Sequence, residues 1–370
     1  MAEENGEKRA DYISKEHPIL ESCDKEKTIE FKAMQILKLL SMNRYRRGPI
    51  KYIEENEDIF LNKIKDAIRN DRPIELILVL FAFKILNPLK TWAEDGSEVD
   101  ISEVASILRF YEISQAITHL YPNGAKFKIS CDGRKYYDPI GMKEEAGIKY
   151  YKNVKSISEY LEVDSHVQLF DEVNFYPNDY KNIEESNLKK VLDVFKKGQD
   201  IDFISFVTKL KCSLALIIPI DKSISLETLA LAFSTGVSDE DLFGFNPEAY
   251  DLRMWVKEES TIRTLKYIAC YNTVKELNII ENISPNALRA TVHPKPGQFG
   301  LYSVNKSVDN VFPHHAQGTS NEQPHLDSLR LKFRADIMRN NKDNQITGII
   351  LDPKKYPFSN GKHPFTFIRS

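Results

Sequence analysis

The stretch AKFKISCDGRK, residues 125–135, is typical of a β-strand that ends in a polar turn. Its first five residues alternate apolar and polar side chains, and Asp132, Gly133 and Arg134 then follow together. Ligands bind at the carboxyl ends of strands in open α/β sheets, and glycine lets the backbone approach a ligand closely. Asp132 is suited to hold an amine, and Arg134 to hold a phosphate or carboxylate. The alternative is a solvated turn, because Asp-Gly is a common turn dipeptide.

A second strand is predicted for residues 74–83, where a nearly continuous apolar run is typical of a strand buried on both faces of a parallel sheet. It leads directly to Lys84, Asn87 and Lys90. Apolar residues recur at helical spacing in several other segments, and short apolar runs lie between them. The alternation of helices and strands predicts an α/β fold. The helices are expected at residues 28–43, 57–70, 100–120, 150–161, 188–197, 226–233, 259–279 and 328–339, and further strands at 166–170, 214–220, 288–292, 301–304, 346–351 and 365–368.

The length of 370 residues exceeds that of a usual single core, so a large domain with a smaller lobe is expected. We expect a polar N-terminal segment at residues 1–25 and the N-terminal part of the main domain at 26–175. A variable, mostly helical lobe or insertion is expected at 176–258, and the C-terminal part of the main domain at 259–370.

The composition excludes several classes of protein. With 51 basic and 54 acidic residues the net charge is -3, which argues against a nucleic-acid partner. The first residues are charged and resemble no signal peptide, and the longest apolar stretch is too short to span a bilayer, so no membrane partner is expected. Because the four cysteines are few and widely spaced, we expect reduced thiols in a cytoplasmic protein.

Several motifs together resemble those of the pyoverdine/dityrosine biosynthesis family, whose bacterial members include isonitrile synthases. They are RPIELILVLFAFKILNPLK at residues 72–90, VDISE at 99–103, PNGAKFKISCDGRKYY at 122–137, LRATVHPKPG at 288–297 and the segment Phe312–Gly318. The motifs keep the family's order, and each lies near an expected strand or helix end. The chain departs from the family pattern at Cys131 (serine), Val99 (proline), His314 (tryptophan) and Ala316 (glycine).

The resemblance implies a Rossmann-like, mostly parallel sheet flanked by helices, with a smaller additional lobe. It also implies a reaction between the amine of an L-amino acid, tyrosine- or tryptophan-like, and ribulose 5-phosphate, which yields an isonitrile without a cofactor or metal. Two alternatives remain: an enzyme that makes N-formyl-tyrosine, and a catalytically inactive protein that binds sugar phosphates or amino acids. A downstream iron/2-oxoglutarate oxygenase is a candidate partner. The oligomeric state stays open.

Such a reaction needs proton carriers and anchors for a phosphate and a carboxylate. Histidine is the usual proton carrier near neutral pH, so His293 and His315 are candidate catalytic residues, together with Lys90 and Asp132. Cations and polar groups at strand ends are suited to bind substrate. The candidate substrate-binding residues are Lys84, Asn87, Glu103, Arg134 and Lys295.

Two patterns have an alternative interpretation. Asp100 and Glu103 have the spacing of a helix capping box, which is a structural role. His325, Asp327 and His363 imitate the two-histidine, one-carboxylate triad of non-heme iron oxygenases. That triad belongs on a strand, whereas the segment after Leu326 has a helical pattern, so no metal site is expected.

Overall fold

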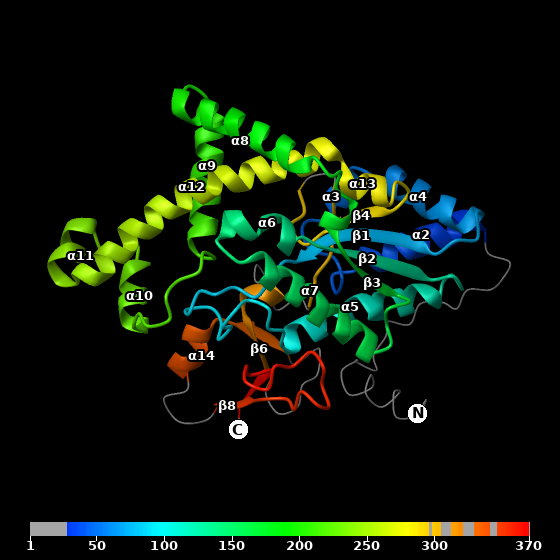
Figure 1. The fold of residues 1–370 in the computed structure, drawn as a ribbon. Coiled ribbons are helices and arrows are strands. Elements are labelled where there is room, and N and C mark those ends of the chain that lie inside the picture. The colour runs from blue at the N-terminus through cyan, green and yellow to red at the C-terminus, as the bar shows by residue number, and fades with distance from the viewer. Residues whose placement is uncertain (1–27, 296–297, 305–311, 321–328, 341–345, 370) are drawn as a thin grey trace.

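A computed structural model describes residues 28–295, 298–304, 312–320, 329–340 and 346–369. Its centre is a five-stranded sheet in the order β3-β2-β1-β4-β5, in which all pairs are parallel (Figure 1). The strands are β1 (Ile74–Phe81), β2 (Ala125–Cys131), β3 (Val167–Asp171), β4 (Leu288–Thr291) and β5 (Phe299–Gly300). β1 is buried on both faces, as its apolar run predicted.

Helices flank this sheet. They are α2 (Ile29–Leu40), α3 (Lys51–Glu54), α4 (Glu57–Arg69), α5 (Ile101–Thr118), α6 (Gly133–Ile140), α7 (Glu144–Tyr160) and α13 (Ile279–Ile283). The Asp100 carboxylate accepts a hydrogen bond at the start of α5, and the Glu103 carboxylate accepts one from the Asp100 amide, so the predicted capping box is present. α5 is buried along most of its length because it lies between the sheet and the smaller lobe.

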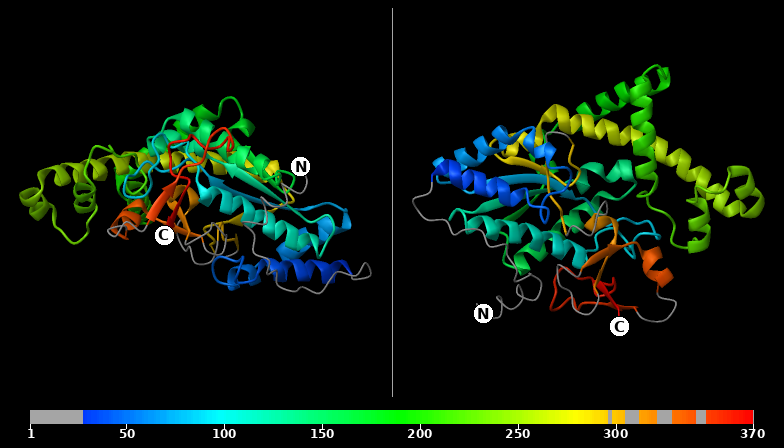
Figure 2. Two further views of the ribbon diagram at one scale, coloured as in Figure 1. Left: turned by 90° about the horizontal axis from the view of Figure 1, so that it is seen from below. Right: turned by 180° about the vertical axis from the view of Figure 1, so that it is seen from behind.

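Residues 172–277 form a short 3₁₀ turn and a helical arm that projects beyond the sheet, with α10 and α11 at its far end in all views (Figures 1 and 2). The turn is η1 (Glu172–Phe175), and the arm consists of α8 (Tyr180–Lys197), α9 (Ile201–Ala215), α10 (Leu226–Ala232), α11 (Asp239–Phe245) and α12 (Pro247–Leu277). The strand predicted at residues 214–220 is wrong. Its residues end α9 and continue as a loop, in which Ile218 and Ile220 join a small apolar core with Leu229. A short apolar run does not distinguish a buried strand from a buried helix end.

The smaller lobe has a four-stranded sheet in the order β7-β6-β9-β8. Its elements are η2 (Pro313–His315), β6 (Gln317–Ser320), β7 (Arg330–Lys332), α14 (Arg334–Asn340), β8 (Ile346–Ile349) and β9 (Thr366–Arg369). The helix predicted at 328–339 is shorter than expected, because β7 occupies its first part. The strand predicted at 301–304 is wrong in its position. The partner of β4 is β5 at residues 299–300, and Leu301 forms only an isolated bridge with Arg46.

The expected α/β class, with a parallel sheet flanked by helices and a smaller lobe, is therefore confirmed. The polar segment 1–25 lies outside the described residues. Within the described ranges, no helix has both the length and the apolar character needed to cross a membrane. Cys131, Cys212 and Cys270 are free thiols.

Candidate active site

A cavity of about 500 Å³ lies at the carboxyl ends of β1, β2 and β4. Lys90, Asp132, His293 and His315, which the sequence suggested as catalytic residues, all line it. They come from segments far apart in the chain, and the parallel sheet brings these segments to one edge. The Asp132 amide donates a hydrogen bond to the Phe81 carbonyl at 3.1 Å, so the ends of β1 and β2 meet at the cavity.

Asp132 immediately precedes α6, so the interpretation of Asp-Gly as a solvated turn is wrong. Gly133 is buried, and an added Cβ there would lie 2.0 Å from the Ala82 carbonyl oxygen. The helix therefore starts in contact with the chain beyond β1. Burial and the neighbouring Glu172 carboxylate raise the pKa of Asp132 to about 8. At neutral pH the carboxyl is mostly protonated.

Lys90 is the only lysine or arginine among the described residues that line the cavity. Its side chain is half-buried, and its Nζ lies 5.3 Å from the centre of the Phe333 ring. Burial lowers the pKa of Lys90 to about 8, because the ammonium form is less well solvated here than in water. A phosphate bound beside it would favour the ammonium form again.

An aromatic cluster forms the wall next to Lys90. The Phe312 ring stacks on His314 at 5.5 Å and meets His293 at 4.4 Å and His315 at 5.2 Å, both edge to face. Burial lowers the pKa of His314 to about 3 and that of His315 well below its usual value. Partial burial and the charge of Arg47 lower the pKa of His293 to about 4.

The expectation that His293 and His315 titrate near neutral pH is therefore wrong. His315 is partly withdrawn from water beside cations, whereas His293 is more exposed and lies near the charge of Arg47. At pH 7 their rings are neutral and available as proton acceptors. His314, for which the sequence gave no catalytic role, also lines the cavity. Its Nδ1 is buried and has no hydrogen-bond partner among the described residues.

The opposite wall is apolar and comes partly from the helical arm. Leu210 and Leu214 of α9, with Ile217 just beyond it, line the cavity beside Tyr136 of α6 and Tyr267 of α12. The two tyrosine rings stack at 4.6 Å. No chemical role was expected for α9 and α12 from their sequence. The only sequence signal is the helical spacing of the three apolar residues, which many core helices share.

The predicted substrate-binding residues do not line the cavity. Lys84 and Glu103 are fully buried in an ion pair with each other. The Asn87 amide donates to the Leu216 carbonyl at 3.2 Å, so it holds the loop after α9. Lys295 is exposed.

Arg134 is placed differently from the expectation as well. Its guanidinium donates to Asp171 at 2.9 Å and to Glu144 at 3.1 Å, so β3 and α7 supply its partners. The two carboxylates offset the positive charge of the guanidinium, so Arg134 would attract a phosphate only weakly.

A metal site is not evident in the described part of the chain, where no group of three or more histidine, cysteine or carboxylate side chains is placed to hold an ion. Of the triad imitated in the sequence, His325 and Asp327 lie outside the described residues, and His363 is buried within 3.4 Å of the Gln317 side chain.

Comparison with known proteins gives three related findings. Residues 64–213 match the family model described as pyoverdine/dityrosine biosynthesis protein. An L-tryptophan isonitrile synthase of Fischerella ambigua is 29% identical over 105 residues, which are 28% of this chain and 32% of that protein. An L-tyrosine isonitrile synthase of Xenorhabdus nematophila is 28% identical over 143 residues, 37% of this chain and 42% of that protein. The matches thus span less than half the length of these relatives.

The fold is also similar to that of a solved protein. The crystal structure of PvcA from Pseudomonas aeruginosa aligns with a TM-score of 0.66 at 18% sequence identity, covering 92% of this chain and all of PvcA. At this identity the likeness concerns the fold. The family match includes Lys90 and Asp132, whereas His293 and His315 lie beyond it. Residues 64–213 are thus similar to the pyoverdine/dityrosine biosynthesis protein family, which confirms the resemblance carried by the motifs.

Proposed function

We propose that this protein is an isonitrile synthase, which joins the amine of an aromatic L-amino acid to ribulose 5-phosphate and leaves the ketose carbonyl carbon on nitrogen. The rest of the sugar departs by carbon–carbon cleavage and loss of phosphate. The observation that carries the proposal is the shared cavity of Lys90, Asp132, His293 and His315. The names of the similar isonitrile synthases support the same reaction class.

The cavity favours the first step, in which the amine must lose its proton before it attacks the ketose. The environment that lowers the pKa of Lys90 to about 8 would lower that of a substrate amine in the same way. The apolar wall with Tyr136 and Tyr267 suits a tyrosine- or tryptophan-like side chain. Binding in this cavity thus supplies both an unprotonated nucleophile and a place for its aromatic ring.

At pH 7 the Asp132 carboxyl holds a proton, whereas the rings of His293 and His315 do not. Asp132 is mostly protonated, so it is suited to donate a proton to the hydroxyl that leaves when the amine and the ketose form an imine. The rings of His293 and His315 are neutral at pH 7, so they can accept a hydrogen bond or a transient proton from the amine, and their low pKa values make them weak bases. Groups whose environments move their pKa values apart are typical of an acid and a base in one site.

Lys90 is the proposed phosphate anchor. The phosphate charge would stabilise its ammonium form, and the partial burial of Lys90 would strengthen this attraction.

A panel of L-amino acids incubated with ribulose 5-phosphate tests the proposal, with a tetrazine to trap isonitrile and mass spectrometry to identify the product. We expect a trapped isonitrile with tyrosine or tryptophan and none without the sugar phosphate. An N-formyl amino acid instead of an isonitrile would favour the dityrosine-type reaction. Binding of both substrates in calorimetry without any product would favour an inactive binding protein.

A further inference from the structure

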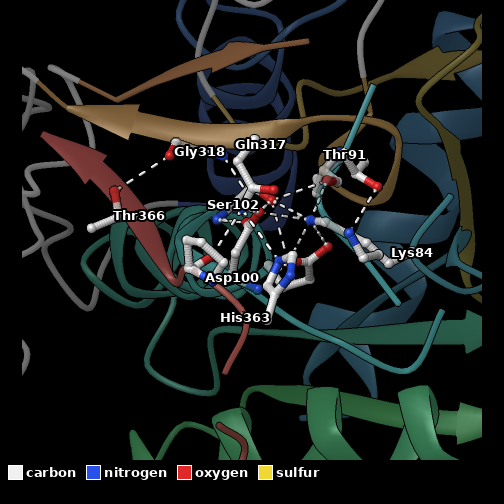
Figure 3. Close-up of polar contacts among 12 residues, drawn as sticks. Lys84, Thr91, Asp100, Ser102, Gln317, Gly318, His363 and Thr366 are labelled. Carbon is white, nitrogen blue, oxygen red and sulfur yellow. Dashed lines mark hydrogen bonds and ion pairs between the residues drawn. The ribbon is translucent and has the colours of Figure 1, made fainter. Parts of the chain in front are cut away.

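A buried polar network lies behind the cavity wall, where the beginning of α5 meets the smaller lobe (Figure 3). We infer that Lys84 and Ser102 are positioning residues, which hold the η2 turn, Pro313–His315, against the cavity through the Pro313 carbonyl. The inference rests on the proposed function, because it assigns His315 of that turn as a proton carrier.

Lys84 is the centre of the network. Its ammonium lies 2.9 Å from an Asp100 oxygen, 3.0 Å from a Glu103 oxygen and 2.9 Å from the Pro313 carbonyl oxygen. The second Glu103 oxygen at 3.1 Å and the Ser102 hydroxyl oxygen at 3.2 Å are also within reach, so all acceptors around this ammonium come from the first turn and cap of α5 or from the η2 turn. No part of the side chain is exposed, so Lys84 cannot reach a substrate in the cavity. The role of Lys84 within the segment 72–90 is therefore a contact with the turn and not with a substrate.

Ser102 makes the second attachment. Its hydroxyl is fully buried on the first turn of α5, and its single proton has three acceptors within reach: Asp100 Oδ1, Glu103 Oε2 at 3.2 Å and the Pro313 carbonyl oxygen at 3.0 Å. The Ser102 amide donates to Asp100 at 2.7 Å, which fixes the serine relative to the cap of the helix. The Pro313 carbonyl therefore accepts from Lys84, and the Ser102 hydroxyl lies between this carbonyl and the Asp100 carboxylate, so it joins the turn to the start of α5.

The chain on either side of this carbonyl is also tied down. The Ile85 amide donates to the His314 carbonyl at 3.0 Å, and the Gln317 side chain donates to Asp100 at 2.5 Å. An added Cβ at Gly318 would lie 2.1 Å from Ile101, so β6 packs closely on the beginning of α5. The Pro313 contacts and these neighbouring attachments thus hold the η2 turn together.

The turn carries the aromatic wall of the cavity. The rings of His314 and His315 lie 4.4 Å apart, and both line the cavity beside Lys90. The charge of Lys84 contributes to the low pKa values of both histidines, so the network acts on the electrostatics of the site as well as its geometry. The other charged or titratable groups that face these rings are Lys90 and His293.

Substitution of Lys84 would leave the buried carboxylates of Asp100 and Glu103 without their cation, which destabilises proteins strongly. A loss of activity could then come from unfolding and would not test the positioning role. Ser102→Ala is the cleaner change, because it removes only the hydroxyl. Ser106→Ala is its matched control: Ser106 lies on the same helix, is also fully buried, and its hydroxyl has no partner among the described residues. Both variants replace serine by alanine, so their helix propensities change equally.

The experiment combines kinetics with nitrogen NMR of the histidine rings. One hydrogen bond to the turn corresponds to about a tenfold change in rate. We expect Ser102→Ala to lower kcat about tenfold with little change in KM, and Ser106→Ala to leave both near the parent values. The ring signals of His314 and His315, assigned by loss of each signal in a glutamine variant, should move and begin to titrate at higher pH in Ser102→Ala only.

The two readouts separate this inference from the proposed function. If no isonitrile is formed, the histidine signals still report whether Ser102 fixes the turn. Equal effects of Ser102→Ala and Ser106→Ala on those signals, or no effect of either, would overturn the positioning role. A normal kcat in Ser102→Ala together with displaced histidine signals would also overturn it, because the turn would then not matter to the reaction.

Discussion

Asp132→Asn tests the electrostatics of the cavity through protein stability. An unfolded chain releases the Asp132 proton near pH 3.8, whereas burial and Glu172 raise the pKa in the folded protein to about 8. Between these values the folded state binds more protons than the unfolded state, so the free energy of unfolding falls as the pH rises. Asparagine does not titrate, and the variant should escape this loss.

The size of the effect follows from the pKa values. Each pKa unit corresponds to about 1.4 kcal/mol. The change from 3.8 to about 8 therefore sets an upper limit of about 6 kcal/mol. We expect a difference of about 4–6 kcal/mol, because a carboxyl that stays mostly protonated at pH 7 needs a pKa at least about 3 units above its usual value. The advantage of the variant over the parent should grow from pH 5 to pH 8 and then stay constant.

Urea unfolding at a series of pH values, followed by tryptophan fluorescence, measures this difference. Asp193→Asn is the control, because Asp193 is an exposed carboxylate on α8. Its difference from the parent should not grow with pH. A constant difference for Asp132→Asn would refute the reasoning, since Asp132 would then titrate alike in both states. The same variant should lose turnover, because an amide cannot supply the proton.

Lys90→Met should raise the KM for ribulose 5-phosphate about tenfold more than that for the amino acid in initial-rate kinetics, because a charged hydrogen bond to phosphate is lost; equal changes would reject the anchor. Arg134→Ala should lower the free energy of unfolding in urea by about 1 kcal/mol and leave both KM values unchanged, since its partners are carboxylates of the protein; a selective change in the sugar phosphate KM would restore the role first expected for it. Gly133→Ala should cost about 1–3 kcal/mol in the same assay through its clash with Ala82. Gly244→Ala, within α11 and with open space around the added Cβ, should stabilise the protein by about 0.5–1 kcal/mol; a similar loss in both variants would contradict the clash.

Local sequence was sufficient for the elements that carry the site. The apolar run of β1, the alternation in β2 and the capping box of α5 each depend on residues within one segment. Because parallel strands end at one edge of a sheet, these elements were enough to predict that Lys90, Asp132 and His293 would meet. That prediction needed no knowledge of side-chain contacts.

The tertiary structure decided which polar residues face the cavity and in what protonation state. Lys84 and Arg134 looked like anchors in the sequence, but carboxylates from α5, β3 and α7 withdraw them from the site. The histidines looked like groups that titrate near pH 7, but burial makes them neutral there. The sequence likewise did not predict that α9 forms an apolar wall of the cavity. Ion pairing, burial and cavity walls depend on contacts between residues far apart in the chain. The spacing of residues within one segment carries no information about such contacts.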